Sequence, residues 1–149
     1  MPLQAGDQAP AFSGITQTGD TISLADFAGK TVVLYFYPKD DTPGCTKEAC
    51  SLRDNFDALL AKDVVIIGVS PDSSESHTKF IDKFTLPFDL IADTDKTVIE
   101  TYGAWGKKMY GRLGVLRHTY VIGPDGVIIK IFKRPKTDIH GEQILDVLP

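Results

Sequence analysis

The sequence has only two cysteines among its 149 residues, and it has no apolar run long enough to span a membrane. The longest such run, residues 64–69, is strand-sized, whereas a membrane helix needs about 18 apolar residues or more. The N-terminus shows neither a basic start nor the apolar segment of a secretory signal. These absences argue against a membrane protein and against a disulfide-rich secreted scaffold. They predict a cytoplasmic protein.

The charge balance gives no sign of a nucleic-acid partner, because the net charge is −4. The charges are unevenly distributed. Residues 107–140 hold eight Lys and Arg and two Asp, a net of +6, while the remainder holds eight basic and eighteen acidic residues, a net of −10. The basic stretch could form an electropositive face beside a site. We interpret it instead as a solvated hairpin and loop, with the exception of Arg117.

Length and apolar periodicity predict one α/β domain over residues 1–149, with a single core. Single strands are expected at 30–37, 64–69 and 89–91, and hairpins are expected to pair 11–15 with 21–24 and 118–122 with 127–132. Helices are expected at 42–61, 73–84, 94–102 and 139–148, and a loop at 104–116. This order predicts a mixed central sheet with helices on both faces and an N-terminal β-hairpin extension. A thioredoxin-like fold has the same order of elements.

The stretch with the strongest chemical signal is Tyr-Pro-Lys-Asp-Asp-Thr-Pro-Gly-Cys-Thr-Lys-Glu-Ala-Cys, residues 37–50. Thr42 suits the N-cap of a helix and Pro43 its first position, which places Cys45 third. The N–H groups there lack intrahelical partners and lie at the positive end of the helix dipole, so they favour thiolate over thiol. Ala49 shares the helix face of Cys45, so the sulfur is expected to point into the protein. The alternative is a buried cysteine that only packs.

The spacing Pro-x-x-x-Thr-x-x-Cys, from Pro38 through Thr42 to Cys45, resembles the active-site signature of the peroxiredoxins. Cys50 adds the spacing Cys-x-x-x-x-Cys, which is similar to the bacterioferritin comigratory protein, or peroxiredoxin Q, group. Arg117, in Arg-His-Thr-Tyr-Val-Ile, looks like the strand-borne catalytic arginine of this family. The resemblance covers nearly the whole chain and implies a thioredoxin-like fold.

The resemblance implies a thiol-dependent peroxidase of the atypical two-cysteine type, which reduces hydrogen peroxide and organic hydroperoxides. Cys45 would be oxidised to a sulfenic acid, and Cys50 would resolve it as an intramolecular disulfide. Thioredoxin or a glutaredoxin-like dithiol would recycle the disulfide, with no metal or organic cofactor. Pro38, Thr42 and Arg117 are the other predicted site residues. Because both cysteines lie in one chain, a monomer is expected.

A second hypothesis is a thiol–disulfide exchange protein or redox sensor that acts on protein partners. An exchanger of the thioredoxin type would be expected to carry Cys-x-x-Cys and a proline just before the edge strand. This chain has four residues between its cysteines, and Arg-His-Thr, residues 117–119, where the proline would stand. Both departures favour the peroxidase.

Three further groups are given structural interpretations. The histidines His77, His118 and His140 lack the close ligand spacing of a zinc site. Asp40 and Asp41 are interpreted as solvated loop carboxylates. Trp105 and the other aromatic residues are expected mostly in the core, although Trp105 could also line the pocket.

Overall fold

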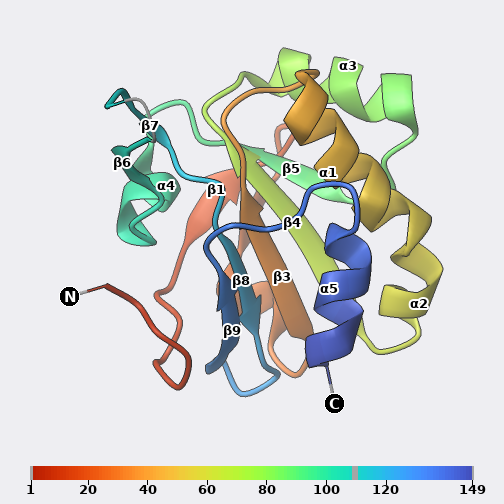
Figure 1. Ribbon diagram of the computed structural model, residues 1–149, viewed down its shortest axis with the longest axis vertical. Helices are drawn as coiled ribbons and strands as arrows, with labels where there is room; N and C mark the ends of the chain where they lie inside the picture. The colour runs from red at the N-terminus through yellow and green to blue at the C-terminus, as the bar shows by residue number, and fades with distance from the viewer. Residues whose placement is uncertain (1, 109–110, 149) are drawn as a thin grey trace.

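The computed structural model describes residues 2–108 and 111–148, and in these a five-stranded sheet with the order β5–β4–β3–β8–β9 forms the centre (Figure 1). The strands are β3 (Thr31–Phe36), β4 (Val64–Ser70), β5 (Asp89–Ala92), β8 (Thr119–Ile122) and β9 (Ile128–Phe132). β3, β4 and β5 are parallel, whereas β8 is antiparallel to both β3 and β9. The sheet is therefore mixed, as predicted.

Helices cover both faces of the sheet, which confirms the predicted layering (Figure 1). One face carries α1 (Pro43–Asp54), α2 (Phe56–Leu60), α3 (Ser74–Phe84) and α5 (His140–Val147). The other carries α4 (Thr97–Thr101) and the N-terminal segment, which holds β1 (Ser13–Ile15), β2 (Thr21–Ser23) and the 3-10 helix η1 (Leu24–Phe27). β1 and β2 are antiparallel, so the predicted N-terminal hairpin is confirmed.

The central strand β3 divides the core in two, because successive side chains of a strand point to opposite faces. Val32, Leu34 and Phe36 pack in the cluster on the α4 side, whereas Val33 and Tyr35 pack against α1 and its neighbours. All six residues of β3 are buried, as expected for a strand covered on both faces. The thioredoxin-like α/β architecture is confirmed.

The helix predicted for 42–61 is wrong in its length, because α1 ends at Asp54 and α2 begins at Phe56. Asn55 separates them, and its side-chain amide donates to the Ser51 carbonyl over 2.9 Å. Such local bonds compete with the regular helix ladder. The close approach of α5 also crowds this point, since a Cβ on Gly141 would lie 2.5 Å from Asn55 Nδ2.

The loop predicted for 104–116 is also wrong, because it contains β6 (Trp105–Lys107) and β7 (Leu113–Val115) in antiparallel pairing. Gly106 faces Gly114 in this hairpin, and two facing glycines leave little apolar alternation to detect. Positions 109 and 110 of the predicted loop lie outside the described residues.

The helix predicted for 94–102 is shorter than expected and forms only at Thr97–Thr101. The carboxylate of Asp93 accepts from the N–H groups of Val98 and Ile99, which ties the residues before the helix into a turn. Gly103 follows with a φ of +70°, as predicted for the residue beyond a helix end. No helix in the described part of the chain has the length and hydropathy needed to cross a bilayer.

Candidate active site

The N-terminus of α1 places Cys45 as predicted, with Thr42 at the N-cap and Pro43 at the first helical position. The Thr42 hydroxyl makes no capping bond; it donates to the Lys39 carbonyl over 2.9 Å. Its oxygen therefore remains available to a ligand only as an acceptor. Within the described chain, the N–H groups of Gly44 and Cys45 have no hydrogen-bond acceptor. Two donors are thus left beside the sulfur.

Cys45 is buried, at 1% exposure, and its sulfur accepts a hydrogen bond from Arg117 Nη2 over 3.4 Å. Sheet pairing explains how residues far apart in sequence meet, because Thr119 of β8 lies opposite Tyr35 of β3. The antiparallel register brings Arg117, just before β8, to the end of β3 that leads into the helix. A Cβ on Gly44 would lie 3.2 Å from Arg117 Nη2, so glycine leaves room for this approach.

Glu48 is a site residue that the sequence analysis missed. It lies one turn after Cys45, is 0% exposed, and accepts from Arg117 Nη1 over 3.0 Å through Oε1. Burial raises the pKa of Glu48 to about 7, against the opposing attraction of Arg117. Burial also acts against the charge of Arg117, but Cys45 and Glu48 raise the pKa of this guanidinium above its ordinary value. The guanidinium is thus held between the sulfur and a carboxylate.

His140, from the N-terminus of α5, lies against the second oxygen of Glu48. Its Nε2 is 3.8 Å from Glu48 Oε2, which has no hydrogen-bond partner among the described residues. Burial lowers the pKa of His140 to about 4, so the ring is neutral near pH 7. Its Nδ1–H then donates to Gln143 Oε1 and its Nε2 accepts from the Thr119 hydroxyl. The contact with Glu48 is therefore not an ion pair.

Glu48→Gln is expected to change how stability depends on pH. The folded-state pKa of about 7 lies above the ordinary 4.5, so the contribution of Glu48 is full below pH 4.5 and is lost as the pH rises through about 7. Relative to the variant, the wild type should lose up to about 3 kcal/mol of unfolding free energy between these limits. Urea unfolding of both proteins at pH 5 and pH 8 measures this change.

The surface variant Glu100→Gln serves as the matched control, because Glu100 is exposed. The lowered pKa of His140 has the opposite pH dependence, but it is present in every protein compared and cancels in the difference. An equal wild-type-minus-variant difference at both pH values would contradict the assignment of a shifted pKa to Glu48.

Asp40 is buried rather than solvated, which corrects the sequence interpretation. Its carboxylate accepts from the hydroxyls of Tyr37 and Ser76 and lies 2.7 Å from His77 Nδ1. His77 Nε2 lies 2.9 Å from the Ile91 carbonyl oxygen, which can only accept, so Nε2 carries the proton of that hydrogen bond. The contact of His77 Nδ1 with Asp40 then requires a second proton between its two atoms. This network fixes the loop ahead of Cys45. Asp41, by contrast, is exposed and pairs with Lys83 over 2.7 Å.

Asp40, Asp72 and His77 are also close enough together to hold a metal ion. However, both ring nitrogens of His77 and both carboxylate oxygens of Asp40 already have protein partners. Asp72 Oδ2 likewise accepts from the Asp40 N–H and from Ser70. We therefore interpret the cluster as structural.

A pocket of about 520 Å³ reaches Arg117, the residue that contacts the sulfur, and is lined by Pro38, Lys107, Lys108, Val115, Leu116, Arg117, His118, Lys133 and Arg134. Of the predicted site residues, Pro38 and Arg117 line it, and Cys45 contacts Arg117 from the adjoining helix. Cys50 is a half-buried free thiol two turns into the helix. Trp105 does not line this pocket; it packs at the edge of the core on the α4 side.

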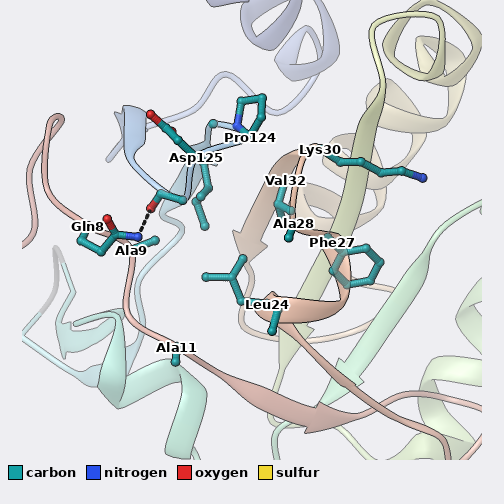
Figure 2. Close-up of a pocket in the computed structure, with 14 residues that line it drawn as sticks. Gln8, Ala9, Ala11, Leu24, Phe27, Ala28, Lys30, Val32, Pro124 and Asp125 are labelled. Atoms are coloured by element: carbon teal, nitrogen blue, oxygen red, sulfur yellow. Dashed lines mark hydrogen bonds between the residues drawn. The ribbon is translucent and has the colours of Figure 1, made fainter.

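A second cavity of about 490 Å³ lies at the opposite end of the sheet, between the N-terminal segment and the turn after β8 (Figure 2). Val32 and Phe27 are among its lining residues, and Gln8, which also lines it, donates to the Gly126 carbonyl over 3.2 Å. Its lining contains no cysteine and no histidine. The reactive groups are therefore gathered at the other end of β3.

Comparison with known proteins places these features in context. The sequence matches the AhpC/TSA family over residues 5–131. It is 44% identical to a putative peroxiredoxin bcp of Coxiella burnetii, covering 97% of this chain and 98% of that one. It is 43% identical to peroxiredoxin Bcp of Escherichia coli K12, covering 99% and 96%.

Two solved structures are similar along most of their length. A cysteine-to-serine mutant of Xylella fastidiosa PrxQ superimposes with a TM-score of 0.92 at 28% identity, covering 98% of this chain and 95% of that one. The bacterioferritin comigratory protein of Xanthomonas campestris, whose structures concern alkyl peroxide reduction, gives 0.85 at 31% identity, covering 91% and 88%.

Proposed function

Because the chain belongs to the AhpC/TSA family, and within it to the Bcp or peroxiredoxin Q group of peroxiredoxins, we propose that Cys45 is the sulfur oxidised by its hydroperoxide substrate. The protein is a thiol-dependent peroxidase. The assignment of Cys45 is supported by the hydrogen bond that its sulfur, in the first turn of a helix, accepts from Arg117. A guanidinium donor stabilises negative charge on sulfur and so favours the nucleophilic form.

In the proposed reaction the Cys45 thiolate attacks one peroxide oxygen, so that an S–O bond forms as the O–O bond breaks. Negative charge develops on the leaving oxygen, which departs as water or an alcohol after it takes a proton. The free N–H groups of Gly44 and Cys45 and the guanidinium of Arg117 are the donors placed to stabilise that charge. The Thr42 oxygen is placed to accept from the peroxide O–H, and Pro38 forms part of the pocket wall.

Cys50 then resolves the sulfenic acid. Its sulfur attacks Cys45 Sγ, water leaves, and a disulfide forms within the chain. A thioredoxin-type dithiol returns both cysteines to thiols, as is general for peroxiredoxins. The proposal takes residues 1–149 as one catalytic domain that works as a monomer, because both sulfurs belong to one chain. It places the protein in the cytoplasm, where such thiols are kept reduced.

The geometry of α1 requires that resolution be accompanied by unwinding. In a continuous helix, residues five apart have Cα atoms roughly 8.6 Å apart and side chains rotated by about 140°. A disulfide needs Cα atoms within about 7 Å and facing side chains. Cys45 and Cys50 both lie within the unbroken helix Pro43–Asp54. They therefore cannot bond until its first turns open.

Hydrogen exchange is expected to show this opening and so to test the proposed disulfide. Amides of residues 42–51 should lose protection in the disulfide form relative to the thiol form, while those of β3 should keep theirs. Cys50→Ser provides the control, because it cannot form the disulfide and should keep the helix protected after one equivalent of peroxide. Equal protection of residues 42–51 in both redox forms of the wild type would contradict the proposal.

A further inference from the structure

Four cations line the pocket beside Arg117: Lys107, Lys108, Lys133 and Arg134. We call these residues the basic rim. No carboxylate in the described part of the chain forms an ion pair with any of them, and none lines the pocket. The fifth cation of the pocket, Arg117, is already paired with Glu48. The rim therefore carries positive charge that no carboxylate of the described residues pairs with.

The rim comes from two segments that are distant in the sequence. Lys107 ends β6 and Lys108 follows it, whereas Lys133 and Arg134 follow β9. Both segments reach the same pocket as Pro38 and Arg117. The basic stretch, which the sequence led us to interpret as solvated, thus contributes these four cations to the pocket that Arg117 lines.

We propose that the basic rim docks the acidic face of the protein dithiol that reduces the Cys45–Cys50 disulfide. The inference rests on the proposed function, which requires an external reductant. A thiolate of the reductant attacks one sulfur of the disulfide, and the other sulfur leaves as a thiolate. The second thiol of the reductant then attacks the reductant sulfur of this mixed disulfide and expels the remaining enzyme cysteine as a thiolate, so that the reductant becomes a disulfide and both cysteines of the enzyme are reduced.

The character of the rim favours a protein over a small anion. Lys107, Lys133 and Arg134 are exposed and Lys108 is half-buried, so the rim has no buried polar group to hold a small ligand in one pose. Exposed charges act mainly by steering a charged macromolecule into contact. The chain outside residues 107–140 has a net charge of −10, so an acidic partner is repelled by the rest of the surface and attracted at the rim.

Charge reversal on the rim tests the proposal. The Cys45–Cys50 disulfide form is prepared with one equivalent of hydrogen peroxide and verified by mass. Its reduction is then followed by stopped flow at low and high salt, with a thioredoxin that is acidic around its dithiol and with neutral dithiothreitol. Lys107→Glu combined with Lys133→Glu should slow reduction by thioredoxin at low salt about tenfold or more. The rate of reduction by dithiothreitol should stay close to that of the wild type.

The matched control is Lys30→Glu combined with Lys79→Glu, which changes the net charge equally at exposed positions away from the rim. It should keep most of the wild-type rate with thioredoxin, and the wild-type rate itself should fall with salt. Equal losses in the two double variants, equal losses with the two reductants, or a salt-independent rate would overturn the docking surface. So would rim-dependent binding to phosphatidylglycerol vesicles together with unchanged reduction by thioredoxin. If the disulfide does not form at all, it is the proposed function that fails.

Discussion

Cys45→Ser is expected to abolish peroxide turnover. Serine is close to cysteine in size, but a neutral hydroxyl is a far weaker nucleophile toward a peroxide oxygen than a thiolate. Because Cys45 is 1% exposed and packs in the core beneath α1, an isosteric change should leave the fold intact. The measurement is peroxide consumption coupled to a thioredoxin system, with circular dichroism to verify folding.

Cys50→Ser is the matched control for this experiment. It should consume one equivalent of peroxide and then stop, with sulfenic acid or a higher oxidation state on Cys45. Mass spectrometry locates the first oxidised sulfur. Initial oxidation at Cys50, or sustained turnover by the Cys45→Ser protein, would show that the roles of the two cysteines are assigned wrongly.

Arg117→Met is expected to slow the oxidation of Cys45 by roughly 10²-fold or more, the scale of losing one donor to transition-state charge. The structure adds a second effect, because Arg117 is the hydrogen-bond partner of the buried Glu48. Removing the guanidinium leaves that carboxyl group buried without a partner, so stability should also fall. Single-turnover oxidation and urea unfolding measure the two effects separately.

The double variant Arg117→Met with Glu48→Gln separates chemistry from stability. It should recover much of the lost unfolding free energy, since no buried acid is left without its cation, while oxidation remains slow. Arg117→Lys should recover only part of the rate, because a single ammonium cannot reach both Cys45 and Glu48 as the planar guanidinium does. Wild-type oxidation rates in Arg117→Met would remove Arg117 from the mechanism.

Much of the fold could be predicted because its strongest signals are local. The apolar run of β3, the hairpin of β8 and β9, and the Thr-Pro start of α1 all lie where the sequence pattern placed them. The errors occurred where the deciding contacts are long-range. The break at Asn55 coincides with the packing of Gly141 from the end of the chain, and the β6–β7 hairpin depends on glycines that face each other across two strands.

The residues of the candidate site also divide into those with a local signal in the sequence and those placed by long-range contacts. Cys45 and Arg117 could be named because their flanking residues resemble a known motif. Glu48 had a local signal, since it lies three residues after Cys45 on the same helix face, but no pattern indicates that Arg117 will reach it. The burial of Asp40 against His77 and the position of His140 beside Glu48 could not be foreseen, because each contact joins elements separated by dozens of residues.

The cavity at the far end of the sheet has a consequence for engineering. Val32, which lines this cavity, belongs to the α4-side cluster, whereas Cys45 and the buried face of α1 belong to the other cluster. Larger apolar side chains that fill this space are therefore expected to raise thermal tolerance without stiffening the segment that we propose opens during each turnover. Under the proposed cycle, stability can thus be added on the face of the sheet that does not carry the opening helix.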